Sequence, residues 1–138
     1  MKLLFSFLLI AHLHNITAMT VLQKQVVSGQ WQLEYIMVPG KSAEELYAGR
    51  KPIIRFDSAA NNVSGNTGCN SFSGPYTCNG NKLQFDTGKM TLTRMACRGE
   101  AEGIFLDVLK KVNRYDIYGD ALLFLQDDVV IMRWKKKS

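Results

Sequence analysis

The stretch Gly68–Tyr76, which reads GCNSFSGPY, decides how this chain folds. It places a cysteine beside an asparagine among glycines and serines, followed by one phenylalanine and one tyrosine. Such a segment has three possible interpretations: a phosphate-binding loop, a catalytic-cysteine loop, or a strand that bends sharply. The rest of the chain decides among them.

The two chemical interpretations lack the residues that they require. The segment matches neither of the glycine-rich phosphate-binding patterns, and no helix is expected directly after it. A catalytic Cys69 needs a neighbouring base that lowers the pKa of its thiol. The chain has two histidines, His12 and His14, and both fall in an N-terminal segment that we expect to be removed. The chemical interpretations are therefore disfavoured.

The architectural interpretation uses every unusual residue of the stretch. Its glycines allow bends or bulges where a strand turns sharply in a rolled sheet. Asn70 can hydrogen-bond to backbone groups that these bends leave unpaired. Tyr76 and the phenylalanine before it supply apolar area for the core. We therefore expect a strongly curved sheet at this point of the chain.

The segments before this stretch are typical of half-buried strands. Val26–Val38 alternates, with Trp31, Leu33 and Tyr35 on the predicted inner side and polar residues on the other. A second strand is predicted over residues 52–57, where the proline stands at the entrance and disturbs no hydrogen bond. A helical turn is expected between the two, around residues 43–47.

The segments after it predict a hairpin, a further strand and a helix. The turn Asn79-Gly80-Asn81 favours a hairpin between residues 76–78 and 82–85. Residues 90–97 (MTLTRMAC) alternate and predict another strand. The period then changes to that of a helix, with one apolar stripe formed by Ile104, Phe105, Val108, Leu109 and Val112. Three short strands at 115–118, 122–126 and 129–134 end the chain as a meander.

These elements predict one α+β domain. The sheet is strongly curved and antiparallel, has seven or eight strands and forms a partly open barrel, with one main helix packed on it. The length of 138 residues suits a single domain. A helix with one apolar stripe fills the concave side, which disfavours an open carrier cavity of the lipocalin kind.

The N-terminus predicts export. Lys2 precedes the apolar run Leu3–Leu13, and Ala18 offers a cleavage point, so we expect a signal peptide over residues 1–18 and a mature domain over 19–138, with its core at 26–134. The apolar run is too short to span a bilayer. A lipid anchor is not expected, because the first cysteine is Cys69. The predicted location is the periplasm or the extracellular space.

Export limits the chemistry of the mature chain. Without histidine, it lacks Ser-His and Cys-His nucleophile pairs and His-ligated zinc. We expect no catalytic residue, no metal site and no cofactor. The net charge of +5 is spread out, apart from a lysine run at 135–137, so we expect no nucleic-acid partner.

Several motifs of this chain resemble the META domain, the family of HslJ-like small exported bacterial proteins. The motifs are SGQWQL, VSGNTGCNSFSGPY, MTLTRMAC and EGIFLDVL, and the resemblance covers residues 26–134. Members are exported or lipid-anchored and are linked to heat and antibiotic stress, and no enzymatic activity is established for them. The resemblance implies a cell-envelope protein of the stress response.

The family motifs also give the candidate site residues. The resemblance together with export favours a disulfide between Cys69 and Cys97 over two buried thiols. Arg94 stands in an apolar strand pattern, so we expect it to pair with Glu102 or with backbone carbonyls near Asn70. Together with Tyr76, these residues form a predicted structural cluster. A ligand-binding site and a catalytic site are the alternatives for it.

The function expected from these observations is that of a non-catalytic binding or interaction module. Its partner would be an envelope protein or a cell-wall component. One alternative is an exported inhibitor of a protease or lysozyme, with residues 40–50 as the contact loop. The other alternative is a small hydrolase that uses Glu34, Asp57 or Glu102, although no spaced acid pair supports it.

Overall fold

The computed structural model describes residues 27–138, so the predicted signal peptide lies outside the described residues. In chain order the elements are β1 (Gly29–Ile36), α1 (Ala43–Leu46), β2 (Ile53–Asp57), β3 (Asn62–Asn66), β4 (Ser71–Asn79), β5 (Lys82–Phe85), η1 (Thr87–Lys89), β6 (Thr91–Leu92), α2 (Ala101–Lys110), β7 (Arg114–Tyr118), β8 (Ala121–Gln126) and β9 (Val129–Lys136). Neither α-helix of this part is long and apolar enough to cross a membrane.

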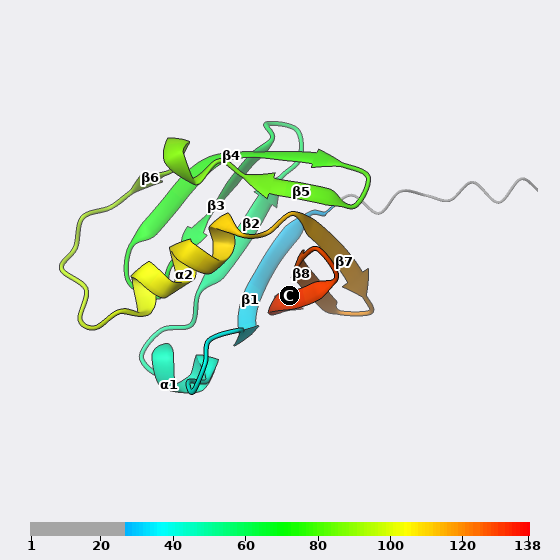
Figure 1. Ribbon diagram of the computed structural model, residues 1–138. Helices are drawn as coiled ribbons and strands as arrows, with labels where there is room; N and C mark the ends of the chain where they lie inside the picture. Colours follow the sequence, from blue (N-terminus) through cyan, green and yellow to red (C-terminus); the bar gives the residue numbers. More distant parts are fainter. Residues whose placement is uncertain (1–26) are drawn as a thin grey trace, which may run out of the picture.

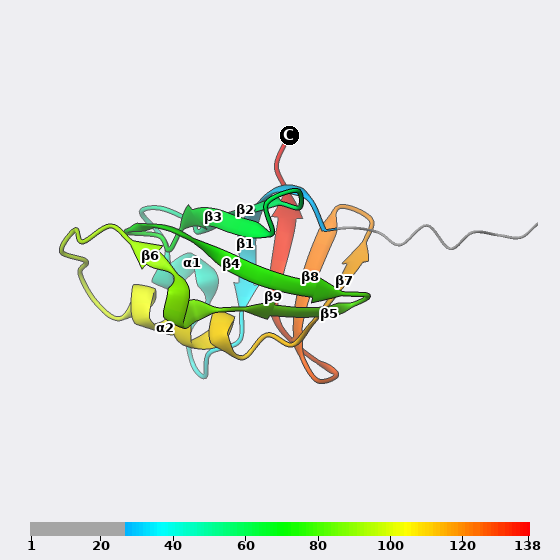
Figure 2. The ribbon, with the colours of Figure 1, turned by 90° about the horizontal axis from the view of Figure 1, so that it is seen from above.

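All nine strands belong to one antiparallel sheet that closes into a ring (Figures 1 and 2). The strand order is β3-β2-β1-β9-β8-β7-β5-β4-β6, and β3 also pairs with β4. The two-residue strand β6 lies outside the ring, at the free edge of β4. The predicted α+β class, the curved antiparallel sheet and the single main helix are thus confirmed.

The interior of the ring is filled by side chains, many of them aromatic. Phe105 of α2 is fully buried, and its ring lies 5.7 Å from that of Phe72 and 6.1 Å from that of Trp134. Phe56 contacts Tyr76 edge to face at 5.2 Å. Aromatic pairs of this kind add to the stability that burial provides. The predicted helical stripe therefore packs into the concave side of the sheet, as expected.

One strand departs from strict alternation. Trp31 and Leu33 of β1 are buried as predicted, but Tyr35 is 39% exposed and Ile36 is buried in its place. The register with β9 shifts between Leu33 and Tyr35, which marks a β-bulge. Because a bulge inserts one residue, it moves the following side chains to the other face. The prediction that Tyr35 points inward was wrong for this reason.

The predicted strand over residues 90–97 was also largely wrong. Only Thr91 and Leu92 form strand pairs, with Ser73 and Phe72 of β4. The chain from residue 93 to the start of α2 has no regular secondary structure and projects beyond the sheet (Figures 1 and 2). The chain leaves the sheet here because the Asn70 side chain bonds to the backbone of Met95.

Candidate functional site

The turn between β3 and β4 is built around glycine. Gly68 has a φ of +93°, a conformation that side chains with a Cβ rarely adopt. A Cβ at this position would also lie 2.7 Å from the ring of Tyr47. Asn66 accepts a hydrogen bond from the Gly68 amide at 3.0 Å, and the Thr67 amide donates to the Asn70 carbonyl at 2.8 Å. The architectural interpretation of this stretch describes what the structure shows.

Asn70 is the centre of the turn, and its side chain is buried. Its Oδ1 accepts hydrogen bonds from the Met95 amide at 2.8 Å and the Thr93 hydroxyl at 2.9 Å. Its Nδ2 donates to the Met95 carbonyl at 3.2 Å. The Asn70 amide group thus takes the place that a neighbouring strand would have beside Met95. This explains why the chain leaves β4 after Leu92.

Glu102, in the first turn of α2, connects the helix to the same turn. Its carboxylate accepts hydrogen bonds from the Thr67 hydroxyl at 2.6 Å, from Asn70 Nδ2 at 3.1 Å and from the Asn70 amide at 3.3 Å. Partial burial alone would raise the pKa of Glu102, but these hydrogen bonds outweigh it and hold the pKa below its ordinary value. Glu102 is therefore ionised at neutral pH.

A disulfide adds a covalent link at the same place. Cys69 and Cys97 are bonded, with their Cα atoms 5.9 Å apart and a sequence separation of 28. The third cysteine, Cys78, is free and half-buried. The two bonded sulfurs lie within 4.8 Å of a Glu102 carboxylate oxygen. Because both sulfurs are used in the disulfide, this group offers no thiolate ligands while the bond is intact.

The structure places Arg94 differently from the prediction. Arg94 is exposed, and no described residue forms an ion pair or hydrogen bond with it. The expected Arg94–Glu102 pair is absent because the chain around Arg94 has left the sheet. Asn70 and Glu102 are brought together as predicted, without the guanidinium. Tyr76 lies apart from them, in the core against Phe56.

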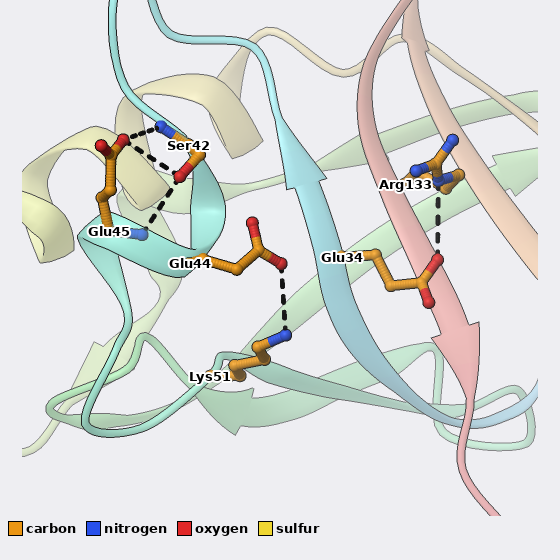
Figure 3. A network of polar contacts seen from close by, with 6 residues as sticks. All are labelled: Glu34, Ser42, Glu44, Glu45, Lys51 and Arg133. Atoms are coloured by element: carbon orange, nitrogen blue, oxygen red, sulfur yellow. Dashed lines mark hydrogen bonds and ion pairs between the residues drawn. The ribbon is translucent and has the colours of Figure 1, made fainter.

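The other carboxylates considered for a hydrolase have separate partners. Glu34 lies 3.5 Å from the Nε of Arg133, as Figure 3 shows. Asp57 accepts hydrogen bonds from the backbone amides of Ala59 and Ala60 in the turn after β2. None of these contacts joins two of the three carboxylates Glu34, Asp57 and Glu102. The structure thus shows no acid pair among them.

The loop proposed as an inhibitor contact contains α1 and is held in place. Ser42 and Glu45 form reciprocal hydrogen bonds at its start, a capping box (Figure 3). Tyr47, which is buried, donates a hydrogen bond to the Ala101 carbonyl at 2.9 Å. The predicted helical turn is confirmed. Through Tyr47, the loop contacts the start of α2, which carries Glu102 of the candidate site.

Two hollows adjoin at this face of the molecule. The larger, of about 700 Å³, is lined by Asn70, Glu102 and the whole segment 90–96. The smaller, of about 360 Å³, lies between the turn at 67–69, the segment 96–98 and residues around Tyr47. Ala96 and Glu102 line both. A rigid, cross-linked turn therefore forms the floor of an open surface site.

A model of the META domain matches residues 24–138, most of the chain and all of the described fold. This chain belongs to the META domain family. The resemblance inferred from the GCN and TRMAC motifs is thereby confirmed. A comparison with curated proteins found no match.

Solved structures share the META domain fold of this chain at low sequence identity. An NMR structure of a protein from Burkholderia xenovorans is 23% identical to this chain with a TM-score of 0.61. The match covers 80% of this chain and 83% of that protein's chain. A crystal structure of a DUF4847 family protein from Bacteroides vulgatus is 12% identical with a TM-score of 0.56, covering 80% and 93%. These neighbours show the fold alone.

Three members of the site were missed by sequence analysis. Thr67 is fully buried and bonds to both Asn70 and Glu102, whereas Thr93 donates its hydroxyl and Met95 offers its backbone to Asn70. A threonine between an asparagine and a glycine is typical of hydroxyl-stabilised turns, which was a usable signal for Thr67. Nothing in the side chain of Met95 indicates its role, because only its backbone takes part.

Proposed function

We propose that this META domain is a non-catalytic binding module that acts outside the cytoplasm, in the cell envelope. Its ligand is an envelope protein or a cell-wall component, bound at the face formed by residues 90–98 and the start of α2. The association with stress is carried over from the family. The observation that carries the proposal is Arg94, a cation that no described residue pairs with, at an open hollow whose lining includes the hydrogen-bonded residues Asn70 and Glu102.

The packing of the domain favours a surface site over an interior one. The concave side of the sheet is occupied by Phe105, Trp134 and their aromatic neighbours. The hollow of about 700 Å³, in contrast, is open and combines apolar side chains with Arg94. Binding surfaces commonly combine an apolar centre with a cation that orients the partner.

The site is also held in one shape. The disulfide, the Asn70 hydrogen bonds and the Glu102 carboxylate link the turn at 66–70 to the segment 93–97 and to α2. A surface that is already ordered loses less conformational entropy when it binds. Such an arrangement suits recognition of a partner.

Export is tested by intact-mass analysis of the protein from its native host. We expect a mature chain that begins near Met19 and contains the disulfide. A chain that still contains residues 1–18 in the soluble cell fraction would contradict export.

Binding is tested by affinity capture from an envelope extract with three baits: the wild type, Arg94→Glu and the matched control Arg55→Glu. Arg55 is an exposed arginine of β2 that bonds to Gln30. We expect one stoichiometric partner with the wild type and the control, and its loss with Arg94→Glu. No retained partner, or equal retention by all three baits, would contradict the proposed site.

A further inference from the structure

We propose that the free edge of β6 binds an extended peptide segment that carries acidic side chains. The segment adds to β6 as a further strand and places a carboxylate against Arg94. This inference rests on the proposed function and specifies the class of ligand.

The backbone of β6 has one paired side and one open side. Thr93 donates its amide hydrogen to the Ser71 carbonyl at 3.0 Å, and Thr91 faces Ser73. Backbone groups alternate in direction along a strand, so the N–H and C=O of Leu92 point away from β4. No other described strand follows β6 in the sheet. An unpaired edge of this kind is a template for the addition of another strand.

The side chains beside this edge offer an apolar surface. Met90 and Leu92 pack partly against the core, whereas Met95 is 56% exposed. All three line the hollow of about 700 Å³. Methionine adapts its shape to different apolar partners because it is unbranched and polarisable. Alternate side chains of an added strand would find apolar contacts here.

The charges of this face favour an acidic ligand. Arg94 lines the larger hollow, and Arg50 and Arg98 line the adjoining one. No described acidic residue forms an ion pair with Arg94: the Glu102 carboxylate lines the same hollow and keeps its negative charge, but it is directed to the turn by three hydrogen bonds, and Glu100 pairs with Lys41. An exposed, unpaired guanidinium is suited to bidentate recognition of a carboxylate.

The edge is ordered in advance, which distinguishes it from an ordinary loop. Asn70 fixes the backbone of Met95 on both its N–H and its C=O, and the disulfide fixes Cys97 two residues later. The segment is therefore held in place beyond the two residues of β6, although no described strand lies beside it there. A peptide can pair with this side without first having to order it.

The experiment is selection from a displayed library of random heptapeptides, with the full mature protein in its oxidised form as bait. Enriched peptides are synthesised with a fluorophore, and their dissociation constants are measured by fluorescence anisotropy. Each peptide is also made with N-methyl groups at alternate backbone positions, which removes the donors that strand pairing needs.

Two pairs of variants separate backbone pairing from other effects. Leu92→Pro removes the outward N–H while leaving the hydrogen bonds toward β4, and Leu92→Ala shortens the same side chain but keeps the N–H. Arg94→Glu reverses the charge at the site, and Arg55→Glu reverses a charge on β2. Circular dichroism and urea midpoints establish that each variant is folded.

We expect peptides that alternate apolar residues with Asp or Glu. Leu92→Pro, Arg94→Glu and N-methylation should each weaken binding at least tenfold, and the two control variants should change it less than threefold. The absence of enriched acidic peptides would overturn the inference, as would peptides that bind Leu92→Pro and the wild type equally well.

The two proposals fail separately. A partner captured from the envelope that depends on Arg94 but binds Leu92→Pro normally would retain the binding function and exclude strand addition. A protein that captures neither an envelope partner nor a peptide would contradict both.

Discussion

Replacing Asn70 by alanine tests whether this residue holds the site together. Its side chain makes five hydrogen bonds. Four go to the Thr93 hydroxyl, to the N–H and C=O of Met95 and to the Glu102 carboxylate, and a weaker one goes from Nδ2 to the Cys97 sulfur. One bond to a charged group contributes about 2 kcal/mol and three neutral bonds about 1 kcal/mol each. Because Thr93 and Met95 are exposed, water can replace part of this. We expect Asn70→Ala to lower the free energy of unfolding by about 3 kcal/mol.

The assay is urea unfolding of the oxidised protein, followed by the fluorescence of its two buried tryptophans. The matched control is Asn62→Ala in β3. It removes a side-chain amide that donates to the Ser73 hydroxyl of β4 and to the Val63 carbonyl. It should cost less than about 1 kcal/mol, because the site is partly open to water. If the two variants have the same midpoint, Asn70 is not the central residue of the site.

Asn70→Asp refines the test through its dependence on pH. The aspartate keeps the acceptor oxygen but sets a second carboxylate beside Glu102, so the pKa of one of the two rises in the folded protein. The folded state then binds more protons than the unfolded state, and stability falls as the pH rises. We expect the variant to be least stable, relative to the wild type, near pH 7 and to recover toward pH 4. A difference that stays constant with pH would contradict this reasoning.

The remaining predictions concern the same face. Reduction of the Cys69–Cys97 bond opens a loop with a sequence separation of 28 and should lower the free energy of unfolding by about 3–4 kcal/mol, measured by urea unfolding with and without reductant; equal free energies would make the bond unimportant for stability. Gly68→Ala should cost about 2 kcal/mol from its positive φ and the contact with a tyrosine ring, whereas Gly103→Ala, in open space on α2, should be neutral or stabilising in thermal melts. The pKa of Glu102 is lowered on folding, so its contribution to the free energy of unfolding is present above its ordinary pKa of about 4.5 and disappears as the pH falls through the lowered value. Glu102→Gln should therefore reduce the loss of stability between pH 6 and pH 2.5 in urea unfolding. An unchanged loss would refute the assignment.

The strands and the helix could be predicted because their patterns are local. Trp31 and Leu33 alternate with polar residues, and the Asn79-Gly80 turn defines its hairpin without reference to the rest of the chain. The bulge before Tyr35 could not be predicted, because it depends on how β1 and β9 fit together in the ring. Burial of single side chains after a bulge is a tertiary property.

Only part of the site could be predicted, because the rest depends on the tertiary structure. The proximity of Asn70 to Glu102 followed from the family motifs, but the role of Arg94 was inferred from its apolar neighbours in an assumed strand. Met95 and Ala96 beside it are exposed, because the Asn70 side chain bonds to the backbone of Met95 and ends the strand early. A charged residue among apolar ones indicates burial only when the segment itself is buried. Arg94→Ala is accordingly expected to leave the free energy of unfolding, measured with urea, within about 0.5 kcal/mol of the wild type.

The uneven closure of the ring determines where the domain opens first. β8 and β9 share six registered residue pairs, whereas β5 and β7 share one, Lys82 with Arg114, supported by backbone hydrogen bonds from Leu83 to Asn113 and from Tyr115 to Asn81. Local opening requires little free energy where few hydrogen bonds have to break. The amide hydrogens of Leu83 and Tyr115 should therefore exchange with solvent long before those of β8. The ring should open at this joint while the Asn70 turn, at the opposite end of β4, stays closed.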